Sequence, residues 1–263
     1  MSRRADPPRR FAAADAELIE VLDNLDGATN YLSWIIDLVG PHVRPPILDF
    51  GAGHGTVTER LAAFGPVTAL DVSPRCVAVL RERLAGHDGI DIVGGVDALD
   101  GRRYGSIVLI NVLEHIEDDV ALLRELRDVL ASDGKVVLFV PAHRLLYSRF
   151  DRMIGHFRRY ERSTLRTTIG AAGLEPELLR FVNPLGAVGW LVIAKLLGRV
   201  PTSVGAIRFF DRRAVPILRR LDRWVRLPFG QSIVCVARVA EPAPRSLDFY
   251  APAVSFREPP VSG

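Results

Sequence analysis

Apolar and polar positions follow one another along this chain in a pattern that predicts strands and helices in turn. Apolar runs of about four or five residues, bounded by turn residues, predict buried strands, and apolar residues three and four positions apart predict amphipathic helices. The predicted strands are residues 47–50, 66–70, 90–93, 106–110 and 136–140, and the predicted helices between them are residues 56–64, 74–84 and 118–130. This order indicates a parallel, doubly wound α/β sheet with right-handed crossovers.

The segments on either side extend the same unit. Residues 11–25 and 29–39 carry apolar residues at helical spacing, and residues 163–172 predict a helix that Ser163 caps and Gly173 ends. A sixth strand is predicted at residues 175–182 and a last one at residues 232–239, with residues 183–230 between them as an insert. We therefore expect one Rossmann-like domain over residues 11–240, with a seven-stranded, mainly parallel sheet, N-terminal helices and a helical insert or lid before the last strand.

The two ends of the chain differ from this domain in composition. Residues 1–10 are rich in Arg and Pro, and residues 241–263 are rich in Pro, so we expect both to be disordered tails. Residues 1–10 lack the apolar stretch of a signal peptide, and Cys76 and Cys235 form neither a disulfide framework nor a metal-ligand cluster. These features favour a cytoplasmic protein.

A glycine-rich turn between the first strand and its helix is the strongest local signal. Asp49 closes the strand, and Gly51, Gly53 and Gly55 follow at alternate positions. Glycines allow positive φ angles and a close approach of the backbone to a ligand, and a helix start presents free N–H groups. Asp71 ends the second strand about 20 residues later, where an acid accepts the hydroxyls of a ribose. The turn and this acid together predict a cofactor of the adenosine type.

The spacing of the glycines separates two cofactor classes. A dinucleotide site has the pattern G-x-G-x-x-G, but its third glycine is replaced here by Thr56. The chain also lacks the Tyr-x-x-x-Lys pair of many nicotinamide-dependent reductases. Its own pattern, an acid followed by G-x-G-x-G, therefore disfavours a nicotinamide cofactor.

This pattern resembles the class I S-adenosylmethionine-dependent methyltransferases, in the small-molecule branch that includes the ubiquinone and menaquinone biosynthesis enzymes. The matching motifs are the segment from Asp49 to Gly55, Asp71 after the second strand, the run Asn111-Val112-Leu113-Glu114-His115-Ile116, and Ser132-Asp133-Gly134-Lys135 before the fifth strand. The resemblance covers about residues 31–174 and the last strand. It implies S-adenosyl-L-methionine as the cofactor.

The resemblance also implies roles for individual residues around that cofactor. Gly51, Ala52, Gly53 and Gly55 would form the cradle, with Asp49 near the methionine ammonium group and Asp71 on the ribose. Asp97 would contact the adenine amine, Asn111 would lie near the transferring methyl group, and Tyr31 would cover the cofactor. Each residue also has a purely structural interpretation. Asp49 and the glycines would form a tight turn, Asp71 would cap a helix, Asp97 would be a loop acid, Asn111 would end a strand and Tyr31 would be a core residue.

The loop after the fifth strand contains the candidate reacting groups. Residues 151–160 resemble the Gly-His-x-x-(Arg/Lys)-(Tyr/Phe) loop of many small-molecule methyltransferases. His156 is the first candidate for a general base and His115 the second, with Tyr160 also in a catalytic position. Arg158 and Arg159 would bind an anionic or hydroxylated substrate, and His143 and Tyr147 would line its pocket. Alternatively, His156 and Tyr160 only brace the loop, with Arg159 paired to Asp151 or Glu161. No metal site is expected, because no cluster of carboxylates is evident.

The insert combines apolar and basic segments. Residues 181–194 are uncharged but too short to span a bilayer, and the following part is rich in Arg. Three interpretations stay open: a lid over the core, a peripheral membrane or lipid-docking surface formed by residues 183–226, or a homodimer interface. Nucleic acid is disfavoured, because the net charge is only +3 and no RNA-binding module is recognisable.

The function predicted from these features is methyl transfer from S-adenosylmethionine to a small-molecule or lipid-like acceptor, by in-line displacement. The alternative is a non-catalytic protein that binds the cofactor and holds a partner through its insert.

Overall fold

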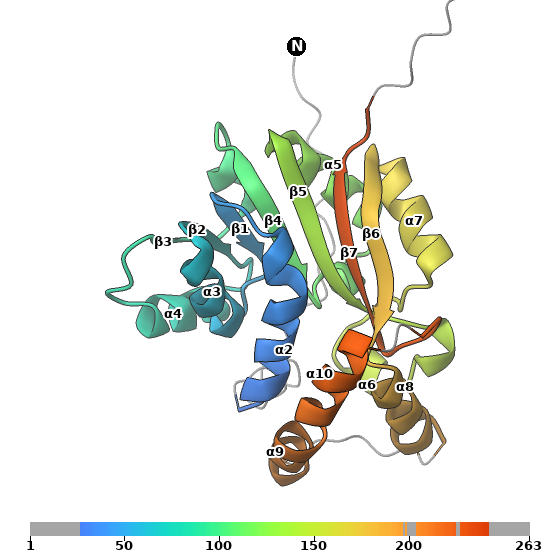
Figure 1. Cartoon of the computed structure of the whole chain (residues 1–263). Helices are drawn as coiled ribbons and strands as arrows, with labels where there is room; N and C mark the ends of the chain where they lie inside the picture. The colour runs from blue at the N-terminus through green and yellow to red at the C-terminus, as the bar shows by residue number, and fades with distance from the viewer. Residues whose placement is uncertain (1–26, 197, 199–203, 225–226, 242–263) are drawn as a thin grey trace, which may run out of the picture.

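The computed structural model describes residues 27–196, 198, 204–224 and 227–241, and these form a seven-stranded sheet in the order β3-β2-β1-β4-β5-β7-β6 (Figure 1). The strands are β1 (Ile47–Phe50), β2 (Val67–Leu70), β3 (Ile90–Val93), β4 (Tyr104–Ile110), β5 (Leu130–Pro141), β6 (Leu174–Val182) and β7 (Ser232–Val239). All neighbouring strands are parallel except β7, which is antiparallel to both β5 and β6. The expected Rossmann-like, mainly parallel sheet is confirmed.

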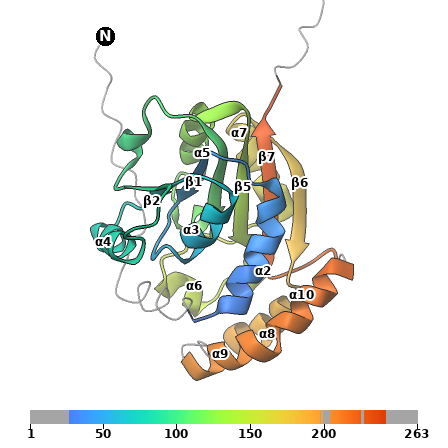
Figure 2. The same ribbon diagram turned by 60° about the vertical axis from the view of Figure 1, so that its left-hand side comes forward.

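Helices cover both faces of this sheet. They are α2 (Thr29–Val39), α3 (Thr56–Leu61), α4 (Pro74–Arg83), α5 (Asp119–Asp128) and α7 (Arg162–Ala171). The short helix α6 (Arg149–Met153) follows β5 and lies at the end of the sheet (Figure 1). Successive residues of β4 point to opposite faces: Ile107 and Leu109 join the apolar cluster of α5 and α7, and Val108 joins that of α2 and α3. Burial on both faces explains why the central strands read as continuous apolar runs. Figure 2 shows α2 and α3 on the near side of the sheet.

Several element boundaries differ from the sequence prediction by a few residues, and two of the differences have an identifiable cause. Helix α7 begins at Arg162 instead of Ser163, because the carboxylate of Glu161 caps it while Thr164 bonds back to the backbone N–H of Glu161. Strand β5 begins at Leu130, so residues 132–134 lie inside it and do not form a turn outside the strand. Its pairing with β4 shifts register between Tyr104 and Ser106, which accommodates these residues. The helix expected at residues 11–25 and the tail expected at residues 1–10 lie outside the described residues. Of the tail expected at residues 241–263, only residue 241 is described.

The insert forms helices that lie at the end of the sheet where β6 ends (Figures 1 and 2). They are α8 (Pro184–Trp190), a π-helical turn (Leu191–Leu196), α9 (Val204–Arg213) and α10 (Val215–Trp224). Val215 and Leu218 of α10 pack on Trp34 of α2. The buried carboxylate of Asp211 in α9 accepts hydrogen bonds from the backbone N–H groups of Asn30 (3.2 Å) and Tyr31 (2.8 Å). The insert therefore caps the first turn of α2, which has no cap of its own.

None of the helices in the described part of the chain is both long enough and apolar enough to cross a membrane.

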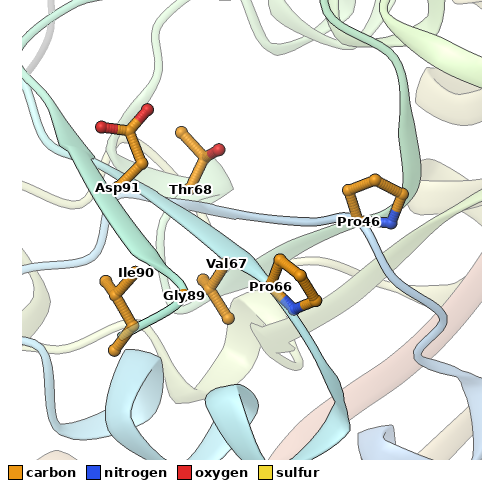
Figure 3. Close-up of a pocket in the computed structure, with 7 residues that line it drawn as sticks. All are labelled: Pro46, Pro66, Val67, Thr68, Gly89, Ile90 and Asp91. Atoms are coloured by element: carbon orange, nitrogen blue, oxygen red, sulfur yellow. The ribbon is translucent and has the colours of Figure 1, made fainter. Parts of the chain in front are cut away.

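A hollow of about 290 Å³ lies at the opposite end of the sheet, where β1, β2 and β3 begin (Figure 3). Its lining residues are Pro46, Pro66, Val67, Thr68, Gly89, Ile90 and Asp91. Ligands of doubly wound sheets bind outside the carboxyl ends of the strands. This hollow lies at the amino ends, so we do not assign the cofactor to it.

Candidate functional site

The strand order reverses at β1, which lies between β2 and β4, and the glycine turn follows β1 at this point. Gly51, Gly53 and Gly55 have φ angles of +76°, +56° and +80°, a backbone region that favours glycine. A Cβ atom on Gly51 would meet a methyl carbon of Val112 at 2.6 Å. The turn therefore requires glycine both for its backbone conformation and for its contact with the segment after β4.

Asp71 fixes this turn from the end of β2. One carboxylate oxygen accepts the N–H of Gly53 at 2.9 Å, and the other accepts the N–H of Ser73 at 2.8 Å. The side chain of Ser73 in turn caps α4 through the N–H of Cys76. Burial raises the pKa of Asp71, although these two N–H donors act in the opposite direction. The side chain is only half-buried, and its remaining lone pairs can accept ligand hydroxyls.

Asp49 lies beneath the turn and is 2% exposed. Its carboxylate accepts a hydrogen bond of 2.6 Å from the hydroxyl of Thr58 in α3. Burial is the main effect on its pKa and raises it to about 7, with Asp71 also raising it and Thr58 lowering it. Asp49 is therefore the buried acid of this turn that changes charge near neutral pH.

Three further predicted cofactor residues lie on other segments. Asn111 directly follows β4, has a φ angle of +51° and donates its N–H to the carbonyl of Phe139 at 2.8 Å. Tyr31 of α2 packs edge-on against the Phe139 ring, with 6.5 Å between centroids, and burial raises its pKa to about 12. Asp97 is exposed in a short 3-10 helix (Val96–Leu99) after β3. Their cofactor roles stay predictions.

His156 lies in a buried polar cluster beside the segment that follows β4. Its Nδ1 is 2.9 Å from a carboxylate oxygen of Asp151, and its Nε2 is 3.7 Å from an oxygen of Glu114. The same Asp151 accepts hydrogen bonds from the N–H and hydroxyl of Ser148 (2.8 and 2.9 Å) and from Arg159 (2.7 Å). Burial raises the pKa of Asp151, but the bond to His156 and the charge of Arg159 outweigh it and bring the pKa to about 2. An ionised Asp151 therefore fixes the proton of His156 on Nδ1 and leaves Nε2 as the acceptor.

Glu114 and His115 complete this cluster. Glu114 is fully buried, and neither carboxylate oxygen has a hydrogen-bond partner among the described residues. Burial raises its pKa to about 7, while the charges of His156 and Arg159 lower it. Burial and the neighbouring His156 lower the pKa of His115 to about 3, and the two imidazole rings lie 4.6 Å apart. Glu114 is thus a buried carboxylate that a proton or a positive charge stabilises at neutral pH.

The sequence did not predict this meeting of Glu114, His115 and His156. One ligand-type atom from each lies within 4.8 Å of the others. A carboxylate and two imidazoles are a donor set that zinc-like cations accept, although no metal site was expected from the sequence. One feature of the sequence could have indicated this cluster. Glu114 and His115 follow β4, and His156 follows β5, so all three lie at the carboxyl ends of neighbouring parallel strands.

The basic and aromatic residues of the loop are bonded within the chain. Arg158 pairs with Asp119 at 2.8 Å, and the guanidinium of Arg159 lies 4.9 Å from the centre of the Trp190 ring. The buried hydroxyl of Tyr160 donates to Asp119 at 2.7 Å, and burial raises its pKa far above the usual range. These contacts agree with the bracing interpretation, including the pair of Arg159 with Asp151.

His143 and Tyr147, the predicted pocket residues, also brace the loop. The Nδ1 of His143 lies 3.0 Å from a carboxylate oxygen of Glu161, and its ring stacks on Phe181 with 4.6 Å between centroids. The hydroxyl of Tyr147 donates to the carbonyl of His156 at 2.7 Å. Both residues therefore hold the segment that positions His156, and their contact with a substrate stays a prediction.

Comparison with known proteins agrees with this geometry. A family model described as a methyltransferase domain matches residues 10–179, which is more than half of the chain. The ubiquinone biosynthesis O-methyltransferase of Xanthomonas oryzae pv. oryzae is 34% identical over 115 residues, or 41% of this chain and 46% of that protein. The corresponding protein of Xanthomonas campestris pv. campestris is 32% identical over 112 residues, or 39% and 47%. The chain thus spans less than half the length of the curated relatives it matches.

Solved structures show the same fold at low sequence identity. The CcbJ methyltransferase of Streptomyces caelestis superposes with a TM-score of 0.53 at 18% identity, covering 82% of this chain and 90% of its own. A protein described as a putative sarcosine dimethylglycine methyltransferase, from Galdieria sulphuraria, gives 0.51 at 18% identity, covering 81% and 85%.

Proposed function

The chain belongs to the class I S-adenosylmethionine-dependent methyltransferases, and from this we propose that it transfers a methyl group to a hydroxyl of a small-molecule acceptor. The observation that supports a hydroxyl as the acceptor group is the pair of His156 and Glu114, which lies beside the segment that packs on the glycine turn. Methyl transfer needs a base only when the nucleophile arrives protonated, as a hydroxyl does. The curated relatives carry the name ubiquinone biosynthesis O-methyltransferase, which also favours oxygen as the acceptor atom.

The residues at the switch point fit S-adenosylmethionine. Three glycines with positive φ angles form the turn between β1 and α3, as a cofactor cradle requires, and the half-exposed Asp71 carboxylate suits a ribose diol. The buried Asp49 suits the methionine ammonium, directly or through water. When bound there, S-adenosylmethionine would supply an activated methyl group on a positively charged sulfur.

His156 is the residue that we assign to remove the acceptor proton. Its Nε2 takes the hydroxyl proton, and the imidazolium that results lies between the ionised Asp151 and Glu114. Asp151 is a positioning residue in this scheme, because it acts by fixing the ring and its tautomer. Burial of the cluster excludes water and strengthens these interactions.

The other two catalytic candidates suit this role less well. His115, with a pKa of about 3, holds a proton poorly at neutral pH, and an efficient general base has a pKa near the working pH. Tyr160 is engaged with Asp119 and keeps its proton, so we propose that it braces the loop.

The acceptor that we propose is a small or lipid-like molecule. The basic side chains of the loop, Arg158 and Arg159, are already paired with Asp119 and Asp151, so an anionic acceptor would have to share them. A neutral hydroxylated acceptor therefore fits the cluster better than an anionic one.

The direct test is transfer of a radiolabelled methyl group from S-adenosylmethionine into extracts of cells that lack this chain. We expect label in one or a few organic-soluble compounds, each heavier by one methyl group than a compound that accumulates in the deletion strain. If the wild-type chain binds the cofactor but transfers no label, the alternative of a non-catalytic cofactor-binding protein is favoured. Label on nitrogen or carbon would contradict the assignment of a hydroxyl.

Cofactor affinity should depend on pH through Asp49. In the cofactor-free protein, burial raises the pKa of Asp49 from the ordinary value of 3.8 to about 7. The carboxyl is therefore largely protonated below pH 7, and it loses this proton as the pH rises through 7. An ammonium group beside Asp49 favours its ionised form instead. Binding of S-adenosylhomocysteine should therefore tighten by about five- to tenfold between about pH 6 and about pH 7.5.

Calorimetric titration of the wild-type chain and of Asp49→Asn checks this dependence. The variant keeps the shape of the side chain and cannot ionise, so its affinity should change less than about twofold over the same interval. An equal pH dependence in both proteins would show that another group, such as Glu114, is responsible.

A further inference from the structure

We propose that the outward sides of α8, α9 and α10 form a docking surface for the face of an anionic lipid bilayer. We call this surface the insert face and define it by the exposed apolar residues of these helices, of the π-helical turn and of the segment after α10. They are Leu185, Val188, Val192, Ile193, Phe209, Phe210, Ile217, Leu221, Leu227 and Phe229. The proposal rests on these side chains and their charged neighbours and does not depend on methyl transfer.

Exposed apolar side chains are concentrated in the insert. Fifteen large apolar residues are exposed among the described residues, and ten of them belong to residues 183–230, which make up less than a fifth of the chain. Single exposed apolar residues are ordinary on a protein surface, but a contiguous patch of them marks an interaction site.

The geometry of α10 shows that these side chains point away from the protein. Val215 and Leu218 are buried against Trp34 of α2. Ile217 and Leu221, four residues apart, are 57% and 41% exposed and lie about 110° around the same helix from that buried pair. An amphipathic helix normally places polar residues on that side. The apolar residues there need a partner that the described chain does not supply.

Helices α8 and α9 also expose large apolar side chains. Asp211 of α9 is buried and binds the start of α2, while Phe209 is 68% exposed. In α8 and the π-helical turn that follows it, Leu185, Val188 and Val192 are exposed at spacings of three and four residues. Figures 1 and 2 show α8, α9 and α10 together at one end of the molecule.

The charges of the insert are almost all positive. Residues 183–230 contain nine Lys and Arg residues and two acids, Asp211 and Asp222. Both acids are buried and bonded inside the fold, Asp211 to α2 and Asp222 to Arg180. Four arginines of α9 and α10 are exposed beside the apolar residues: Arg208, Arg212, Arg213 and Arg220. Within the described residues, the outward side of the insert therefore combines apolar and cationic groups with no exposed acid.

An anionic bilayer is the partner that satisfies both kinds of group. Its acyl boundary accepts Phe, Leu and Ile side chains, and its anionic phosphate head groups attract Arg. A second copy of the chain would bring two cationic surfaces together. A nucleic acid would neutralise the arginines but leave the apolar side chains in water.

The insert face lies close to the proposed reacting cluster. Trp190, at the end of α8, donates its indole N–H to the carbonyl of Leu146 at 3.0 Å and stacks beneath the guanidinium of Arg159. Arg159 in turn pairs with Asp151, the residue that holds His156. Docking through the insert would thus bring the His156 loop near the bilayer, where a lipid-soluble acceptor is concentrated.

The test is co-flotation of the full chain with vesicles. With about one-third phosphatidylglycerol in phosphatidylcholine, the wild-type chain should float, and with phosphatidylcholine alone the bound fraction should fall several-fold. The double substitution Phe209→Ser with Ile217→Ser should lower affinity for the anionic vesicles by about tenfold or more. Arg212→Gln with Arg220→Gln should lower it similarly at low salt and less at high salt.

Matched controls separate docking from folding. Phe64→Ser with Val239→Ser removes two exposed apolar residues outside the insert (37% and 38% exposed) and should float as the wild type does. All variants should keep the melting temperature and the S-adenosylhomocysteine affinity of the wild type. The proposal is overturned by no flotation of the wild type, by flotation unchanged in the insert variants, by concentration-dependent dimers that these variants abolish, or by binding to nucleic acid in place of vesicles.

Discussion

Substitution of Gly53 by Arg should abolish cofactor binding, with a loss of affinity for S-adenosylhomocysteine of at least about a hundredfold. Gly53 lies in the centre of the turn after β1, has a φ angle of +56°, and donates its N–H to Asp71 at 2.9 Å. A side chain there forces the backbone out of a region that L-residues rarely adopt and fills the space over the turn. It also pulls the backbone at position 53 away from Asp71, so this carboxylate, which we propose binds the ribose, loses its orientation. Isothermal titration calorimetry measures the result.

A second glycine provides the matched control for this substitution. Gly101 lies in the loop between β3 and β4 with a φ angle of +72°, and a Cβ atom there meets no other atom within 4 Å. Gly101→Arg therefore imposes similar backbone strain far from the turn. We expect it to bind S-adenosylhomocysteine as the wild type does, with a similar melting temperature for both variants. An equal loss of affinity in the two variants would mean that backbone strain, and not the cradle, is responsible.

Substitution of His156 by Ala should slow methyl transfer by about a hundredfold or more while leaving cofactor affinity within about twofold. The imidazole is held by Asp151 at 2.9 Å through Nδ1, and its Nε2, 3.7 Å from Glu114, is left to accept the proton of the acceptor hydroxyl. The residue lies outside the glycine turn, so cofactor binding should survive its removal. The measurement is the initial rate of label transfer to the acceptor, with cofactor affinity determined on the same sample.

Two further variants separate proton transfer from loop bracing. His87→Ala removes an exposed imidazole after α4 and should leave the rate unchanged. Asp151→Asn keeps the size of the residue that orients His156, so its rate should fall, and its pH dependence should differ from that of the wild type. An unchanged rate in His156→Ala would assign His156 to the bracing of its loop. A loss of cofactor binding in that variant would place His156 in the cofactor site instead.

The sequence predicted those parts of the fold that depend on local pattern. The strands of the parallel sheet are buried on both faces and read as apolar runs, and Ser73 and Pro74 identify the start of α4 because a cap and a first-turn Pro act within one turn. The switch point followed from the order of the elements. The start of α7 was misplaced by one residue because Glu161, which caps it, also binds His143 and the N–H of Arg144, contacts that no local pattern encodes.

In the candidate site, too, the part formed by one local segment was predictable and the part formed by distant residues was not. The turn from Gly51 to Gly55 with Asp71 was predictable, because its backbone demands and spacing lie within one βαβ unit. The partnership of His156 with Glu114 was not, because about 40 residues separate them and their meeting depends on how the loop after β5 folds back. The same applies to Asp211, which caps α2 from a helix 180 residues further along the chain.

The central claim is that the turn after β1 is an S-adenosylmethionine site, and a titration of the wild-type chain tests it most directly. Unfolding would be followed with S-adenosylmethionine, S-adenosylhomocysteine, NAD and NADP in turn. We predict that the two sulfur compounds raise the melting temperature in a saturable way, that neither dinucleotide does, and that Gly53→Arg removes the effect. Stabilisation by NAD or NADP but by neither sulfur compound would contradict the claim.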